Sequence, residues 1–480
     1  MRAQDTLRLE LEEAIQIAIK HSIDSKVVKN QLRSAYWSYR TYQREMLPEL
    51  SFNGTLPQYS KSMTLYQNED GTYKYLSSDY NRFNGAFSLT QNIPWTGGTL
   101  SISTSHERLQ QYGKTELTRY KTTPVSITLN QPLFGFNSIK WQQKTEPLRY
   151  SAAMKQAVIN QEQVAMTVIN YYFSLLSEEI NHEITRQNMA NAQRLHTIAE
   201  ARRRMGQISE VELMQMKSSL LRAEISLTNV QFSLENKMFN LRSFLGFGED
   251  VIIVPSVPEF VAGNIPQLDF DEVLEMARKN NPNTENIQRS LIEADRDVSQ
   301  AKANRWNVNF YASFGMSGQD EKFRTAYNST FWDNDQTLRV GVSIPILDWG
   351  KGKGRVKMAE ASREITQARA EKQDLDFVQE VYLRVQNFNN QPRQLELAKY
   401  MDQMAQERYK TSVELYVLEK IDVLNLNDAE NSKDQSRRSY ISEIHSLWSY
   451  YYQLRMLTLY DFINGVPIKL AFDFEQMIKE

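Results

Sequence analysis

The chain has 480 residues, a formal net charge of −2 and 24% charged residues, so it offers no basic footprint for nucleic acid. It contains no cysteine, which excludes disulfides, thiolate catalysis and zinc–thiolate sites. No apolar run approaches the roughly 18 residues that a membrane-spanning helix needs. The strands of a membrane β-barrel are short and alternate between apolar and polar residues, so a search for apolar runs does not detect them.

Two segments far apart in the chain open in the same way. Residues 9–22 and 268–281 align at an offset of 259, which pairs Leu9 with Leu268 and Glu13 with Glu272. Each predicts a helix of about 35 residues whose acidic first turn suits the helix dipole. The prediction is two repeats, at 7–248 and 267–465, with a connector at 249–266 and a C-terminal tail at 466–480.

Each repeat continues with residues that alternate between apolar and small polar side chains, the pattern of strands with two different faces. The predicted strands cover about 49–66, 82–104, 122–134, 307–317 and 337–347. Polar stretches around 68–80, 106–121 and 319–336 predict loops.

The alternation gives way directly to helical patterns at Pro132 and Pro345, which lie 213 residues apart. Since the opening helices are offset by 259, the first repeat holds 46 additional residues. Those residues predict an extra hairpin at about 80–120, with a glycine-rich turn at 94–98.

Long paired helices follow each change from strand to helix. Leucine at every seventh position from Leu213 to Leu241 predicts a coiled-coil seam. Helices of about 60 residues would be roughly 90 Å long, which is too long for a compact domain and favours a tube or rod. Pro392 lies inside one of them and predicts a kink.

This order of elements resembles that of the TolC-type outer-membrane efflux proteins, over about residues 7–462. The resemblance is carried by the strand-to-helix segments QPLFGFNSIKWQQ and IPILDWGKGKGRVKMAEA and by the helix reversals RRRMGQISEVELMQMKSSL and YVLEKIDVLNLNDAE. It implies an α+β membrane protein in which three chains share one outer-membrane β-barrel, continued by a long α-helical coiled-coil barrel. The usual member supplies four strands per chain. The insertion here therefore implies either a larger barrel or a hairpin elsewhere on the rim.

The resemblance implies a passive exit duct in a tripartite efflux or type I secretion system of a Gram-negative bacterium. The implied partners are two further copies in a homotrimer, a periplasmic adaptor (membrane fusion) protein, an inner-membrane transporter of the RND or ABC type, and outer-membrane lipid. No cofactor, metal or nucleic acid is expected. Because Arg2-Ala3-Gln4 precedes a helical pattern, we expect a signal peptide to have been removed.

The alternative is an elongated coiled-coil structural or adaptor protein with a soluble β-domain. Aromatic residues near the strand ends favour the barrel, since membrane barrels carry aromatic rims. These residues are Trp95, Phe134, Phe136, Trp141 and Trp349.

Nothing in the sequence positions an acid, base or nucleophile, so we assign no catalytic residue and expect no enzyme. The resemblance places a pore gate, ringed by aspartates, at the helix reversals; Asp422 falls on the first ring position, and Asn425 replaces the aspartate on the second. Glu212 matches the carboxylate of an ionic lock, but Leu418 stands where the arginine would be. Both acidic residues also fit ordinary roles at helix starts. The candidates for adaptor docking at the tip are Gly206, Gln207, Ile208, Tyr416, Val417 and Leu418.

Overall fold

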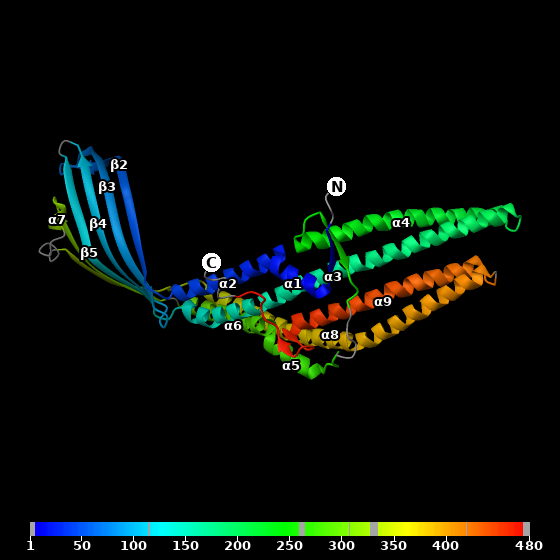
Figure 1. The fold of residues 1–480 in the computed structure, drawn as a ribbon. Coiled ribbons are helices and arrows are strands. Elements are labelled where there is room, and N and C mark those ends of the chain that lie inside the picture. The colour runs from blue at the N-terminus through cyan, green and yellow to red at the C-terminus, as the bar shows by residue number, and fades with distance from the viewer. Residues whose placement is uncertain are drawn as a thin grey trace. The chain divides into compact units, whose positions relative to one another are not determined.

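The computed structural model describes residues 5–113, 116–258, 265–306, 308–326, 335–418 and 420–473. The chain forms two compact units (Figure 1). Unit 1 comprises Met1–Ala35, Ser151–Thr284 and Gln373–Glu480, and unit 2 comprises Tyr36–Tyr150 and Glu285–Lys372. Residues 2–4, part of the connector and the end of the C-terminal tail lie outside the described residues, and so does the expectation of a signal-peptide remnant.

Unit 2 contains a six-stranded antiparallel sheet in the order β2-β3-β4-β5-β7-β8. Its strands are β2 (Glu49–Gln67), β3 (Tyr73–Asn92), β4 (Thr99–Tyr112), β5 (Leu117–Pro132), β7 (Asn309–Asp320) and β8 (Gln336–Ser343). The additional residues of the first repeat form β3 and β4, which lie inside the sheet between β2 and β5. A short helix, α7 (Phe323–Ala326), follows β7.

The strands of the first repeat are longer than the sequence predicted. β3 begins at Tyr73, and Gln67 pairs with Tyr73 across a tight turn, where the sequence predicted a loop over 68–80. Likewise β4 continues to Tyr112. The segment over 82–104 is two strands, because the turn before Gly98 separates β3 from β4.

Unit 1 holds most of two helical hairpins, whose helices run antiparallel in Figure 1; the first helix of each hairpin begins in unit 2. The first joins α3 (Ser138–Arg204) to α4 (Glu210–Leu245), and the second joins α8 (Lys351–Val417) to α9 (Val423–Thr458). The predicted leucine seam of α4 is half-buried along its length and fully buried at Leu241. α8 continues through Pro392 as one helix.

Each opening segment is two helices, where the sequence predicted one. α1 (Leu11–His21) and α2 (Ile23–Arg44) separate at Ser22, which is extended and whose hydroxyl accepts the Ser25 N–H at 3.1 Å. α5 (Phe270–Asn280) and α6 (Asn283–Arg305) separate at Asn281-Pro282. Proline has no N–H and disfavours a helical residue before it, which accounts for the second break.

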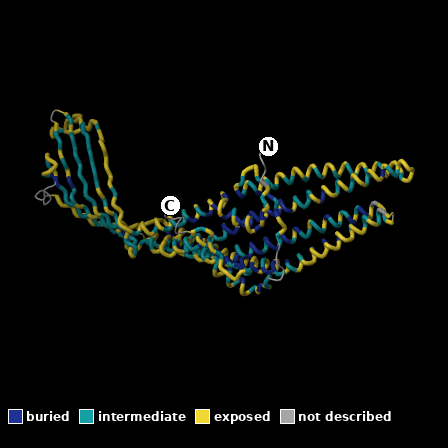
Figure 2. The backbone as a smooth tube through the Cα atoms, in the orientation of Figure 1, coloured by how far each residue is buried: buried dark blue, intermediate teal, exposed yellow. Residues whose placement is uncertain are grey.

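The core of unit 1 gathers where α1, α3, α8 and α9 approach one another, shown by the buried stretches of these helices in Figure 2. Two short strands, β1 (Asp5–Leu9) and β6 (Val251–Pro255), pair in parallel beside it. The buried Tyr172 hydroxyl donates to the Leu9 carbonyl at 2.8 Å and accepts the Ser256 N–H at 3.0 Å. α3 is thereby tied to both strands. Another short pair, β9 (Tyr460–Asp461) and β10 (Val466–Pro467), follows α9.

Candidate functional site

One face of the sheet in unit 2 carries an apolar row that crosses all six strands. Its members lie opposite one another in register: Leu50, Leu89, Ile102, Ile127, Phe314 and Leu338. All except Phe314 are between 39% and 71% exposed. A sheet in a soluble domain packs such a face onto a core. Here the apolar face remains accessible.

The opposite face carries small polar side chains. The adjacent row across the six strands consists of Ser51, Ser88, Ser103, Ser126, Gly315 and Thr337. The next row has Thr90 and Ser101 as partners, with hydroxyl oxygens 3.2 Å apart. An apolar outer face and a polar inner face are the distribution of a sheet that separates lipid from water.

The sheet ends in two open edges, because β2 and β8 each pair on one side only within the described residues. All pairings are antiparallel and there are six strands, so β2 and β8 run in opposite directions. Exposed edges present unpaired N–H and C=O groups that pair readily with another strand. An antiparallel β2–β8 pairing between copies is therefore geometrically consistent.

Three of the aromatic residues that the sequence assigned to barrel rims are highly exposed: Trp95 and Phe134 lie just outside strands, and Trp349 lies between β8 and α8. Trp95 is 82% exposed, Phe134 is 72% exposed and Trp349 is 90% exposed. Such amphipathic or apolar rings at strand ends suit a membrane–water boundary.

The reversal between α3 and α4 is built from a glycine and a capping box. Gly206 has φ +72°, a left-handed conformation that glycine adopts without strain. The Ser209 N–H donates to the Glu212 carboxylate at 2.8 Å, and the Glu212 N–H donates to the Ser209 hydroxyl at 3.2 Å. Glu212 therefore caps its own helix.

The reversal between α8 and α9 has no glycine. Its turn closes with a hydrogen bond from the Lys420 N–H to the Leu415 carbonyl at 2.9 Å. Asp422 is the N-cap of α9, and its carboxylate accepts the Asn425 N–H at 2.8 Å. The side chain of Asp422 remains exposed, so its charge is available to solvent and ions.

A cavity of 620 Å³ between the two reversals brings five of the nine candidate residues together. They are Gln207, Ile208, Glu212, Tyr416 and Asp422. Gly206, Asn425 and Leu418 are not among its lining residues, and the side chain of Val417 lies outside the described part of the chain. Arg202 also lines this cavity. This arginine is the first residue of the RRRMG segment at the reversal, and no sequence motif marks it as part of a site.

In the part of α3 that precedes the reversal, polar contacts join this helix to the second hairpin. Asn191 donates to the Tyr409 hydroxyl at 2.8 Å, and that hydroxyl lies 3.4 Å from the Glu430 carboxylate. Asn188 donates to Asp434 at 2.7 Å. Burial raises the pKa of Glu430, because a charged carboxylate is costly away from water. Burial, followed by the nearby Glu430 charge, also raises the pKa of Tyr409.

No helix in the described ranges has the length and apolarity needed to cross a bilayer. Among those same residues, no group of three or more histidine, cysteine, aspartate or glutamate side chains is arranged to hold a metal ion.

The sequence matches a protein family described as "Outer membrane efflux protein", over residues 91–247 and 273–447. The two matched segments fall in the two repeats. No curated protein sequence matches the chain.

Solved structures with a similar fold include the Campylobacter jejuni CmeC outer membrane channel, which is 14% identical with a TM-score of 0.65, over 98% of this chain and 88% of that one. The outer-membrane channel OprN is 16% identical with a TM-score of 0.63, over 93% and 89%. The open state of the Neisseria gonorrhoeae MtrE outer membrane channel is 13% identical with a TM-score of 0.59, over 93% and 88%. At these identities the likeness establishes the fold, which is mixed α and β.

Proposed function

Because the chain belongs to the outer membrane efflux protein family, a TolC-type family of channels and not of enzymes, we propose that three copies form a passive exit duct. The duct conducts substrates across the periplasm and the outer membrane of a Gram-negative bacterium, in a tripartite efflux or type I secretion system. A periplasmic adaptor docks at the helix reversals, and an inner-membrane transporter of the RND or ABC type supplies the energy.

The observation that carries this proposal is the two-faced sheet. Its apolar row is exposed at Ile127 and its neighbours, whereas the row through Ser126 is small and polar. In a closed barrel these rows face lipid and water respectively. A soluble scaffold with a β-domain would leave the apolar row in water, which disfavours that alternative.

Closure of the sheet by three copies uses the free edges β2 and β8. Six strands from each of three chains make 18 strands in total. With about 4.8 Å between strands and a tilt of about 40°, the barrel backbone is roughly 36 Å wide, against roughly 24 Å for 12 strands. Because β3 and β4 lie within the sheet, we propose the larger barrel and not a hairpin on the rim.

Assembly of the helices is supported by exposed apolar stripes on the hairpins of unit 1. The face of α4 away from the leucine seam carries side chains that are 50–69% exposed: Val211, Met214, Leu221, Ile225, Phe232 and Phe239. A comparable stripe on α8 is 47–70% exposed: Leu375, Tyr382, Leu383, Leu397, Tyr400, Met401 and Met404. Such stripes at heptad spacing pack against further helices in coiled coils. In the proposed trimer, the hairpins of neighbouring copies cover them.

In the proposed duct, the helix reversals form the gate. Three copies of Asp422 focus a negative potential on the mouth, and Asn425 supplies a polar, uncharged position one turn later. Glu212 and Arg202 line the same cavity as Asp422. We propose that Arg202 supplies the positive charge of the ionic lock with Glu212, because Leu418 stands where the family has an arginine.

Disulfide trapping of the β2–β8 seam tests the assembly, and the cysteine-free chain makes engineered cysteines unique. We combine Ser51→Cys on β2 with Thr337→Cys or Ser343→Cys on β8, since strand stagger leaves the seam register open. One pair should bring Cα atoms within the roughly 4.4–6.8 Å that a disulfide needs and give dimers and trimers on non-reducing gels.

The matched control combines Ser103→Cys on the interior strand β4 with Thr337→Cys. β4 is paired on both sides, so this combination should stay monomeric on the same gels. Absence of cross-linked species from every β2–β8 pair, in protein that is folded in detergent or vesicles, would refute the shared barrel.

A further inference from the structure

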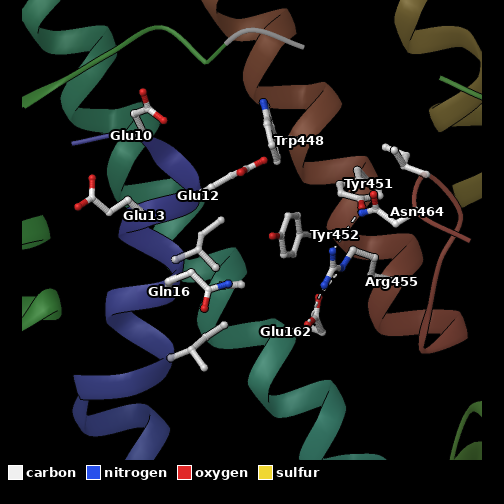
Figure 3. Close-up of a pocket in the computed structure, with 14 residues that line it drawn as sticks. Glu10, Glu12, Glu13, Gln16, Glu162, Trp448, Tyr451, Tyr452, Arg455 and Asn464 are labelled. Carbon is white, nitrogen blue, oxygen red and sulfur yellow. Dashed lines mark hydrogen bonds and ion pairs between the residues drawn. The ribbon is translucent and has the colours of Figure 1, made fainter. Parts of the chain in front are cut away.

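Unit 1 contains a cavity of 660 Å³ between α1, α3 and α9, for which the duct function supplies no role (Figure 3). Glu10, Glu12 and Glu13 lie on its α1 side, at the start of that helix. Trp448 and Tyr452 form part of the opposite wall, on α9. The volume falls within the range of small-molecule sites, which is about 300–1,000 Å³.

The only arginine among the lining residues is already neutralised by carboxylates. Arg455 lies 2.6 Å from the Glu162 carboxylate and 3.1 Å from that of Asp461. It also lies over the Tyr452 ring, 4.7 Å from its centroid. These contacts hold Arg455 in the wall, so it does not offset the charge of other groups.

The three glutamates of α1 form no ion pair with a described residue. Together with Glu162, the lining has four carboxylates against one guanidinium, a net charge of −3. Of the three, Glu12 extends across the cavity towards Trp448, whereas Glu10 and Glu13 point away from α9 in Figure 3. The field in the cavity therefore favours a cation, and Glu12 is the carboxylate placed to meet it.

A second observation is the hydroxyl group of Tyr452. Its side chain is 94% buried, since the residue is 6% exposed, and its hydroxyl has no hydrogen-bond partner among the described residues. Figure 3 shows this hydroxyl directed towards α1, into the cavity. The ring is buried but the hydroxyl opens onto the cavity, so a ligand that bonds to it takes the place of water.

The rest of the lining is mixed, with Gln16 and Asn464 beside an apolar and aromatic part. Ile15, Ile19 and Ala165 line the cavity beside Trp448, whose ring stacks against Tyr452 with centroids 6.3 Å apart. This apolar and aromatic part suits the body of an organic cation, which gains from contact with aromatic faces.

We propose that this cavity binds a small organic ammonium ion, whose charged nitrogen lies between the Glu12 carboxylate and the Tyr452 hydroxyl and whose apolar body contacts Trp448 and Ile15. The ammonium group donates to the hydroxyl oxygen and to the carboxylate. This site lies outside the sheet and the helix reversals, so it is independent of the proposed barrel and gate.

The test uses the full chain purified in mild detergent and 2-phenylethylammonium as probe, with binding measured by calorimetry. We expect one site per chain and affinity that falls as salt increases, because the attraction is partly between exposed charges. The uncharged analogue 2-phenylethanol has nearly the same shape and should bind at least about tenfold more weakly.

Two variants locate the site. Glu12→Gln should weaken binding of the probe about two- to fivefold, the range for a single exposed charge pair. Tyr452→Phe removes the hydroxyl while keeping the ring and should weaken binding by a similar factor. The matched control is Asp271→Asn on α5, at the position that aligns with Glu12 in the second repeat, and it should leave affinity unchanged.

Failure of the probe to bind the wild-type chain would overturn the proposal, and so would equal affinity for the wild type and Glu12→Gln. The latter outcome identifies binding elsewhere on the protein or in the detergent. Because Glu12 is exposed, its substitution should not unfold the chain. Cross-linking of the β2–β8 seam in the same preparation shows separately whether the duct assembly has formed.

Discussion

Two adjacent residues on β5, Ile127 and Ser126, offer the sharpest test of which sheet face meets lipid. Ile127 belongs to the apolar row and pairs with Ile102 and Phe314, whereas Ser126 belongs to the polar row and pairs with Ser103. Ile127→Arg and Ser126→Arg introduce the same charge one residue apart. The two variants differ only in the face of the sheet from which the arginine side chain projects.

The expected costs differ because the solvents differ. An arginine on the lipid face of a barrel costs about 2–4 kcal/mol near the bilayer midplane, whereas lumen positions remain in water. With three copies of Ile127→Arg in a trimer, the total is about 6–12 kcal/mol. We therefore expect Ile127→Arg to destabilise the folded protein in vesicles by at least about 2 kcal/mol per chain. Ser126→Arg should change its stability by well under about 1 kcal/mol.

The assay is urea-dependent folding into phosphatidylcholine vesicles, followed by tryptophan fluorescence. Far-ultraviolet circular dichroism of the same samples checks that the helices have formed. Equal costs for the two variants would refute the assignment of faces. A smaller cost for Ile127→Arg than for Ser126→Arg would reverse it, and folding of either protein without lipid or detergent would favour a soluble domain.

Three further outcomes are expected. Asp422→Asn keeps an N-cap side chain but removes the charge, so it should lower cation selectivity in reversal-potential measurements and leave thermal stability unchanged. Asp422→Ala should lower cation selectivity and also cost about 0.5–2 kcal/mol of stability. Unchanged selectivity in both variants would remove Asp422 from the gate. Because the pKa of Glu430 is raised in the folded chain, the contact between hairpins should weaken as pH rises above the ordinary glutamate pKa of 4.5 and through the raised value. Amide hydrogen exchange of α9 should become faster over that pH range, and Glu430→Gln should abolish the pH dependence. Tyr172→Phe leaves the Leu9 carbonyl and the Ser256 N–H without their partner, so urea denaturation should show a loss of about 1–3 kcal/mol, and a loss below about 0.5 kcal/mol would contradict this role.

Alternation in the sequence was enough to place most strand centres, because every second residue meets the same environment. It did not place the strand ends. β3 extends from Tyr73, yet Tyr73 to Tyr80 are polar or mixed on both faces and lack a period of two. Backbone pairing with β2 holds that stretch in the sheet, and pairing leaves no mark on hydropathy. The break at Pro282, by contrast, has a local cause in the sequence, because proline lacks an N–H and disfavours a helical residue before it.

The helix reversals were predictable to a similar extent. Asp422 and Glu212 act within a few residues of themselves as helix caps, so local sequence is sufficient to recognise them. The contact between Asn191 and Tyr409 joins residues 218 positions apart, and neither belongs to a motif. The sequence also does not predict that Arg202 lines one cavity with Glu212 and Asp422, because that arrangement depends on how two hairpins meet.

The most direct test of the central proposal is ion conductance across a planar bilayer after addition of the detergent-purified protein. We predict discrete steps of uniform size, carried by particles whose protein mass is about 168 kDa, three times 56.0 kDa. A folded protein that remains monomeric in water without detergent and produces no conductance would contradict the channel.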